Sequence, residues 1–297
     1  MRIVSLVPSA TEMLFALGVG EEVTAVTHEC DHPPEALDLP RITRDVIGPG
    51  LPPGEMDRVV RELTLAGRSL YELDEPMLRA LQPDLIVTQA LCTVCAVSYD
   101  EVQAIADAMD PQPRVLSLDP HTVGEVLGDV RTLARATGAE DAGAALIEQA
   151  ARRIDAVRLA VRDARPVPVA ALEWLDPVFS AGHWTPQLIE YAGGLDVLGL
   201  PGEHSETRTW DEVRAAAPEV VVVMPCGYGA ERALEEAEDV ADELEELGAR
   251  RIVAVDAAAY FSRPGPRIID GLELMAHILH PDRVPDAPAP VLEFALG

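Results

Sequence analysis

The sequence predicts an α/β protein with two Rossmann-like lobes, each built on a parallel sheet, joined by one long connecting helix. Short apolar runs alternate with helical segments in both end regions of the 297-residue chain, which is typical of parallel βα units. Between these regions, residues 121–164 keep one apolar helical face, with a pause at Gly138. A flexible linker would be rich in Gly, Ser or Pro instead. We therefore expect an N-terminal lobe over 1–120, the connecting helix over 121–164, a C-terminal lobe over 165–280 and an extended tail over 281–297.

The N-terminal lobe begins with an apolar strand, expected at residues 2–7. Ser9 and Glu12 follow with the spacing of a capping box, so a helix is expected to start there and to stop at Gly18. A proline-rich irregular segment is expected over 32–54. Further strands are expected at 23–27, 85–88 and 114–118, and further helices at 55–67, 75–81 and 99–109.

The C-terminal lobe begins after Arg165 and Pro166, because proline breaks the preceding helix. Glycines at 193 and 194 end the first helix of this lobe, and Gly248 ends a long charged one. Strands are expected at 167–174, 220–224 and 251–256, and helices at 185–192, 210–216, 229–247 and 266–279.

Composition excludes several classes of partner. The formal net charge is −28 and every basic residue is arginine, which disfavours binding to nucleic acid or to an anionic membrane surface. Mean hydropathy is only +0.10, and no apolar run reaches the roughly 20 residues of a membrane-spanning helix. The apolar start of the chain, residues 1–8, is too short for the core of a signal peptide. We therefore expect a cytoplasmic protein that neither inserts into membranes nor binds nucleic acid.

The four cysteines each lie beyond a predicted strand, where open parallel sheets bind ligands. Cys92 and Cys95 form a C-x-x-C pair that suits zinc, with Cys30 and Cys226 as further thiolate ligands. A redox pair, or small buried side chains without a chemical role, are the alternatives. The sequence leaves these three interpretations open.

Histidines and aromatic residues add candidates near the same strand ends. His28 and His183, like Cys30 and Cys226, are candidate axial donors to the metal of a bound metal chelate, although a lone histidine can equally be structural. Aromatic residues make up only 4% of the chain. Trp174, Tyr228 and Tyr260 lie at or just beyond strand ends, where flat ligands are held by such surfaces; core packing is the alternative.

Catalytic motifs are absent from the sequence. It contains no phosphate-binding P-loop and no G-x-S-x-G elbow, so we assign no catalytic residues and expect no enzyme. Two alternatives stay open. One is a zinc-dependent enzyme that uses Cys30, Cys92 and Cys95, and the other is a sensory or interaction module with a vestigial cleft.

Five motifs, taken in order, carry a family resemblance over roughly residues 1–280. Together they resemble the helical-backbone substrate-binding proteins for cobalamin, heme and iron-siderophores, and they suit the cobalamin branch best. The resemblance implies a corrinoid, or a related tetrapyrrole or metal chelate, bound as a small-molecule ligand in the cleft between the lobes. The motifs are Ile3–Glu12, Cys30–Ala36, Leu81–Val87, Tyr191–Gly194 and Phe261–Arg267.

The resemblance also assigns ligand-contact positions. In the first lobe one falls on Glu29, and in the second lobe a run falls on residues 259–263, where Tyr260 and Phe261 would stack against a corrin. With the residues argued above, the candidate ligand-binding set is Ser9, His28, Glu29, Cys30, Gln89, Leu91, Cys92, Trp174, His183, Trp184, Tyr228, Tyr260, Phe261 and Arg263.

Members of this family place one acidic residue on each lobe to hold arginines of an ABC permease. The matching positions are Glu101 in the first lobe and Ser262, which is not acidic, in the second. Because a signal peptide is also not evident, docking to a permease is not expected. The resulting hypothesis is a non-secreted protein that scavenges, buffers or hands over its ligand.

Overall fold

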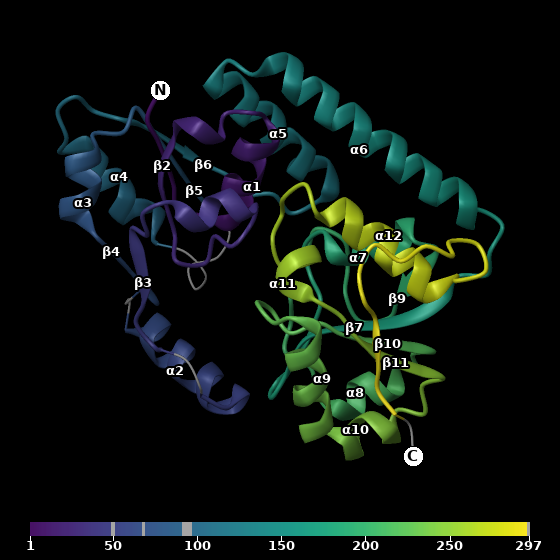
Figure 1. Cartoon of the computed structure of the whole chain (residues 1–297). Helices are drawn as coiled ribbons and strands as arrows, with labels where there is room; N and C mark the ends of the chain where they lie inside the picture. Colours follow the sequence, from purple (N-terminus) through teal and green to yellow (C-terminus); the bar gives the residue numbers. More distant parts are fainter. Residues whose placement is uncertain (49–50, 67–68, 91–96, 296–297) are drawn as a thin grey trace. The chain divides into compact units, whose positions relative to one another are not determined.

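The computed structural model describes residues 1–48, 51–66, 69–90 and 97–295 (Figure 1). The chain divides into two compact units. Unit 1 comprises Met1–Pro120 and Leu127–Ile147, and unit 2 comprises His121–Val126 and Glu148–Gly297. Each unit contains its own sheet of parallel strands with helices around it, which confirms the predicted two-lobed α/β fold.

The predicted connecting segment forms two helices, α5 (Val123–Thr137) and α6 (Glu140–Val161). The break lies at Gly138, whose φ is +71°. This left-handed backbone is the usual way for glycine to end a helix, and it explains the pause in the sequence pattern. The two helices contribute residues to both units. The domain boundaries that we placed at residues 120 and 164 stay predictions.

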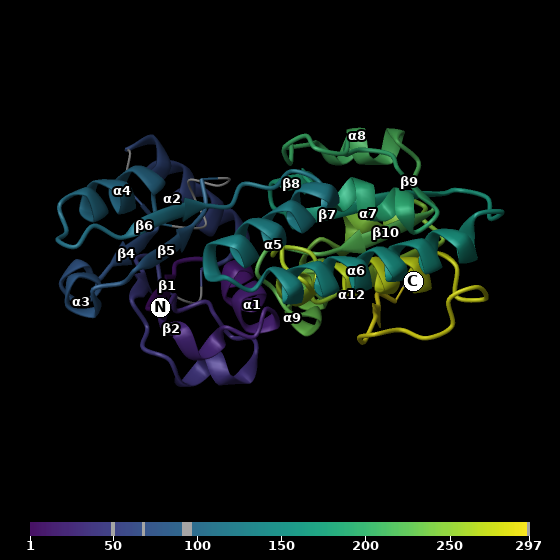
Figure 2. The ribbon, with the colours of Figure 1, turned by 90° about the horizontal axis from the view of Figure 1, so that it is seen from above.

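The sheet of unit 1 is fully parallel, in the order β2-β1-β5-β6. Its two central strands are apolar and buried, as strands covered on both faces must be. Figure 2 shows the ribbon around this sheet from above. The strands are β1 (Ile3–Ser5), β2 (Val23–Val26), β5 (Leu85–Thr88) and β6 (Arg114–Ser117).

Helix α1 (Pro8–Ala16) begins two residues earlier than the sequence predicts, and without the expected capping box. Val7 is the N-cap, and it has no side-chain oxygen to cap with. Pro8 occupies the first turn, where proline is favoured because its missing N–H needs no partner. Ser9 and Glu12 lie inside the helix and are buried. The capping box was therefore wrong.

The proline-rich segment of unit 1 contains structure that the sequence did not predict. β3 (Thr43–Asp45) and β4 (Tyr71–Leu73) pair as antiparallel strands, and Ile42 beside them is fully buried in the core of unit 1. Tertiary packing therefore orders a segment that local patterning marks as irregular. The helices of this unit are α2 (Pro53–Leu65), α3 (Glu75–Leu81) and α4 (Tyr99–Asp107), with short 3-10 turns at Gly20–Glu22 and Pro34–Asp38.

Unit 2 has a mixed sheet in the order β12-β11-β10-β7-β8, with β9 pairing β7. The strands β9, β7, β10 and β11 run parallel, and β8 and β12 are antiparallel to their neighbours. The strands are β7 (Val167–Leu175), β8 (Val178–Ser180), β9 (Gly194–Asp196), β10 (Val220–Val223), β11 (Arg251–Ala254) and β12 (Leu292–Glu293).

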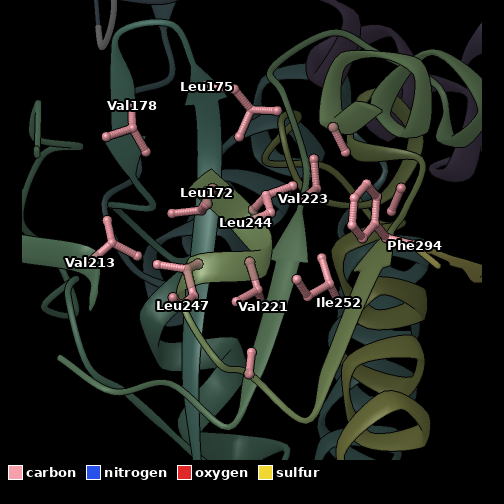
Figure 3. Packing of buried hydrophobic residues seen from close by; sticks show 14 of the residues in the cluster. Leu172, Leu175, Val178, Val213, Val221, Val223, Leu244, Leu247, Ile252 and Phe294 are labelled. Atoms are coloured by element: carbon pink, nitrogen blue, oxygen red, sulfur yellow. The ribbon is translucent and has the colours of Figure 1, made fainter. Parts of the chain in front are cut away.

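One hydrophobic cluster of unit 2 lies on one face of this sheet (Figure 3). Val221, Val223 and Leu172 are fully buried there, and they pack against Leu244 from the helical layer. The predicted helix over 229–247 is interrupted at Val240, whose φ is −120°. The helices of unit 2 are α7 (Thr185–Tyr191), α8 (Trp210–Ala215), α9 (Ala230–Asp239), α10 (Ala241–Glu246), α11 (Ala257–Tyr260) and α12 (Ile268–Leu279).

The C-terminal tail is more than the extended arm that the sequence predicts. Its strand β12 pairs antiparallel with β11. Phe294, which follows β12, is 8% exposed and belongs to the core of unit 2. In the part of the chain that the structure describes, no helix combines the length and the apolarity needed to span a membrane.

Candidate functional site

A buried group of hydroxyl and thiol side chains lies beyond strands β1 and β2 of unit 1. The Sγ of Cys30 is 3.1 Å from the Oγ1 of both Thr11 and Thr27. Thr11 also donates to the hydroxyl of Ser5 over 2.8 Å. Cys30 is only 1% exposed. In this conformation its thiol is part of the interior, which does not favour the predicted contact with a ligand or metal.

His28 and Glu29 follow in the same loop. The Nδ1 of His28 is 2.7 Å from the hydroxyl of Thr43, and its ring meets Tyr71 edge-on at 4.8 Å between centroids. Its Nε2 is buried and has no hydrogen-bond partner among the described residues. Glu29 is exposed and accepts a hydrogen bond from the Tyr71 hydroxyl over 3.0 Å. Tyr71, from β4, is therefore the aromatic side chain that packs against this loop.

The remaining candidates of unit 1 are enclosed or lie outside the described residues. Ser9 is 2% exposed and Gln89 is 7% exposed. Leu91, Cys92 and Cys95 fall in the segment 91–96, which is not described. The four-cysteine metal cluster therefore stays a prediction; of its other two members, Cys30 is buried in unit 1 and Cys226 is exposed in unit 2.

Unit 2 carries an aromatic pair at the carboxyl ends of its strands. The rings of Trp174, near the end of β7, and Tyr228, shortly after β10, are 5.4 Å apart. The guanidinium of Arg232 lies 3.8 Å from the centre of the Tyr228 ring and also donates to its hydroxyl. Burial raises the pKa of Tyr228. Trp174 is partly exposed, whereas Tyr228 is nearly enclosed, so Trp174 presents the accessible ring.

Two other predicted aromatic contacts belong to the interior of unit 2. Trp184 is 5% exposed, and its indole N–H donates to the carbonyl of Phe261 over 2.8 Å. Phe261 is 1% exposed and is among the largest fully buried side chains. A stacking role does not fit the burial of these rings, and we leave both out of the proposed site. Tyr260 and Arg263 are partly exposed, and burial raises the pKa of Tyr260.

Glu173, on β7, holds two loops of unit 2 beside the aromatic pair. Its carboxyl group accepts hydrogen bonds from the Gly182 N–H, over 3.3 Å, and from the Ser205 hydroxyl. Desolvation raises the pKa of Glu173 to about 7, and these two hydrogen bonds oppose the shift. A single acidic residue within a strand gives no sequence signal for this bridging role.

Three histidines converge next to these loops. His183 and His204, each adjacent in sequence to a residue that Glu173 holds, have their Nε2 and Nδ1 atoms 3.1 Å apart. His121, which precedes α5, completes the group, and one nitrogen from each ring lies within 4.8 Å of the other two. Desolvation, and then the neighbouring His204 and His121, lower the pKa of His183 to about 4. Of the three, only His183 could be proposed from the sequence, because the residues come from separate segments with no common spacing.

The comparison with protein families agrees with this architecture. Residues 3–257 match the family model described as periplasmic binding protein. The chain belongs to the periplasmic binding protein family. This assignment confirms the family resemblance and the expectation of a binding protein rather than an enzyme.

Individual relatives share most of the chain at low identity. It is 21% identical, over 276 residues, to the vitamin B12-binding protein of Vibrio cholerae, covering 92% of this chain and 86% of that protein. It is 23% identical to the uncharacterized ABC transporter substrate-binding lipoprotein YvrC of Bacillus subtilis, covering 95% and 80%. Among solved structures, the apo form of the periplasmic heme-binding protein RhuT from Roseiflexus superposes with a TM-score of 0.67 and 26% identity, covering 95% of this chain and 98% of that one.

These relatives correct the predicted location. We expected a cytoplasmic protein, because residues 1–8 do not resemble the core of a signal peptide. The relatives are periplasmic binding proteins and a transporter lipoprotein, and such proteins act outside the cytoplasm. The cytoplasmic assignment was therefore wrong. Of the two observations against docking to a permease, only the non-acidic Ser262 remains.

Proposed function

We propose that this protein captures a corrinoid or a related tetrapyrrole such as heme outside the cytoplasm and delivers it to an ABC permease. Family membership supports the general activity, which is reversible binding of a small molecule. The names of two relatives, one binding vitamin B12 and the other heme, favour a large flat metal chelate as the ligand.

The observation that carries the proposal is the aromatic pair of unit 2. Trp174 and Tyr228 lie at the carboxyl ends of parallel strands, where this class of fold binds ligands. Arg232 supports the Tyr228 ring, so the pair is held in place before a ligand arrives. A ring fixed in advance loses little conformational freedom on binding, which favours affinity.

The test is equilibrium binding of cyanocobalamin and of hemin to the full-length protein, followed by tryptophan fluorescence and visible absorbance. Trp174→Ala should weaken binding by about tenfold, which corresponds to roughly 1.4 kcal/mol of lost aromatic contact. Trp210→Phe is the matched control, because Trp210 packs against the core of unit 2; it should leave the affinity unchanged.

Two outcomes would count against the proposal. If neither chelate binds the wild-type protein, the ligand belongs to another class. If the wild type binds but Trp174→Ala binds equally well, the tetrapyrrole function stands and the aromatic pair is not its contact surface.

Docking to a permease is a separate part of the proposal. Glu101 is exposed in the first turn of α4, and the family resemblance assigns it the docking role in unit 1. Glu101→Arg should lower ligand delivery in vesicles that contain a vitamin B12 permease. The affinity for ligand in solution should not change, because Glu101 is not among the proposed ligand contacts.

A further inference from the structure

We propose that His121, His183 and His204 of unit 2 form a binding site for one divalent transition-metal ion of the zinc type. The site is separate from the cysteine cluster that the sequence suggests, and it does not require the proposed tetrapyrrole ligand. It belongs to unit 2 alone, since all three histidines lie in that unit.

The spacing of the three rings fits a tetrahedral ion. The ring centroids are 5.4 Å apart for His121 and His183, 5.3 Å for His121 and His204, and 4.9 Å for His183 and His204. For imidazoles bound to zinc at about 2.05 Å with tetrahedral angles, centroids lie roughly 5.2 Å apart. Rotation of the rings in place, with little backbone movement, would therefore bring the three nitrogens onto one ion.

The backbone holds two of these loops together. The His183 N–H donates to the carbonyl of Glu203 over 2.6 Å, and the Gly202 N–H donates to the carbonyl of His183 over 2.9 Å. His183 itself has a φ of +54°, which is uncommon for a residue with a side chain. The loops that carry His183 and His204 are thus joined by backbone hydrogen bonds.

Gly182 and Glu173 complete the support of these two loops. A Cβ at Gly182 would lie 2.3 Å from the Ser205 nitrogen and 2.6 Å from the His204 carbonyl carbon, so glycine is required for this approach. The Glu173 carboxyl group accepts hydrogen bonds from both loops. Glu173 is therefore a positioning residue, since it acts through the two loops and not on the ion.

The chemistry of the donors selects the ion. Neutral imidazole suits Zn²⁺, Cu²⁺, Ni²⁺ and Fe²⁺, whereas Ca²⁺ and Mg²⁺ prefer oxygen. Among the described residues the group supplies three ligands, so the fourth position of a tetrahedral ion would be open to water or to another small ligand.

The first test uses the full-length protein after removal of metals with a chelator and without any tetrapyrrole. Zn²⁺ titration against a chromophoric competitor should show one tight site per chain. His183→Gln and His204→Gln should each weaken zinc binding by about a hundredfold or more, because each removes a ligand. Glu173→Gln should weaken it by about tenfold, as the loss of a supporting hydrogen bond does.

Two controls separate this site from the alternatives. His277→Gln should bind zinc as the wild type does, because His277 hydrogen-bonds the carbonyl of Val284 outside the group. The Cys92→Ser/Cys95→Ser variant should also retain the site. Zinc binding that survives in the histidine variants and is lost in the cysteine variant would overturn the proposal in favour of the cysteines.

Cobalt spectroscopy of the wild-type protein gives a second measurement that does not depend on any variant folding. Co²⁺ bound by three imidazoles should show the visible bands of a tetrahedral site without sulfur-to-cobalt charge transfer. A strong charge-transfer band, or no tight binding of either ion, would contradict the histidine site. Because no tetrapyrrole is present, neither result depends on the function proposed above.

Discussion

The polar groups beyond the parallel strands differ in chemistry between the two units. In unit 1 they include a buried network of hydroxyls and a thiol, in which Ser5, Thr11 and Cys30 hydrogen-bond to one another. In unit 2 they include titratable groups, and burial shifts the pKa of both Glu173 and His183. Related sheets therefore support a buried hydroxyl and thiol network in one unit and buried titratable groups in the other. Buried titratable groups near strand ends are candidates for a functional role.

The largest expected effect comes from the close approach of two loops in unit 2. Gly182→Ala should lower the free energy of unfolding by about 2–3 kcal/mol, because the new methyl group meets backbone atoms that cannot move aside. In the control variant Gly128→Ala, nothing lies within 4 Å of the added Cβ, and alanine should stabilise helix α5 by about 0.5–1 kcal/mol. Urea denaturation measures both. A Gly182→Ala variant as stable as the wild type would show that the loops are not tightly apposed.

The next effect contrasts the ion pairs of the two units. Arg153 on α6 bonds both Asp270 and Glu273 on α12, all partly buried in unit 2, and these carboxylates raise the pKa of Arg153. Arg153→Ala should cost about 1–2 kcal/mol of unfolding free energy, since it leaves two carboxylates side by side. Arg44→Ala, which breaks the exposed pair with Glu72 in unit 1, should leave stability unchanged. If the two variants lost the same unfolding free energy, the partly buried ion pairs would contribute no more to stability than the exposed one.

A smaller effect tests the neutral network of unit 1. Thr11→Val keeps the shape of the side chain but removes the hydroxyl shared with Ser5 and Cys30. It should lower the free energy of unfolding by about 1 kcal/mol, the usual cost of a lost internal hydrogen bond. Thr132→Val is the comparison, since that hydroxyl donates to Gly128 within its own helix. If both variants lower the free energy of unfolding by the same amount, the network contributes no more to stability than a local hydrogen bond within a helix.

The smallest expected effect concerns Asp196 at the end of β9. Burial raises its pKa, although the N–H groups of Leu198 and Gly199 donate to its carboxyl group. Native Asp196 therefore binds a proton more readily than the unfolded chain does, so its contribution to stability is complete in acid and is lost as the pH rises through the raised pKa. Asp196→Asn removes this dependence.

Thermal unfolding of wild type and Asp196→Asn between pH 3 and pH 8 provides the measurement. The melting temperature of the variant should rise relative to that of the wild type as the pH increases. The two melting temperatures should differ least in acid. The opposite trend would mean that the native site favours the charged carboxylate.

Local sequence patterns predicted most helices and strands, because the apolar periodicity of each element lies within one continuous stretch of residues. Helix α3 and strand β5 begin and end where the sequence placed them. The antiparallel pair of β3 and β4 was not predicted, because these short strands pair across an intervening helix. The capping box at Ser9 failed because Pro8 already starts the helix.

The candidate site was less predictable than the fold. Trp174 and Tyr228 could be found from their places at strand ends. Phe261 and Trp184 are buried instead, and the indole N–H of Trp184 donates to the carbonyl of Phe261. Whether an aromatic ring near a strand end faces solvent or the core depends on its neighbours in space. The position of the residue in the sequence does not reveal those neighbours.

The two α/β units, the family and the class of small-molecule binding protein could be predicted from the amino-acid sequence, because they depend on local periodicity and on motifs in a fixed order. The folded structure establishes which candidate residues lie together. It enclosed the Cys30 thiol among hydroxyls, and it gathered His121, His183 and His204 from three loops. Residues that are far apart along the chain come together here because two loops approach closely at Gly182. A local sequence pattern does not reveal such long-range contacts.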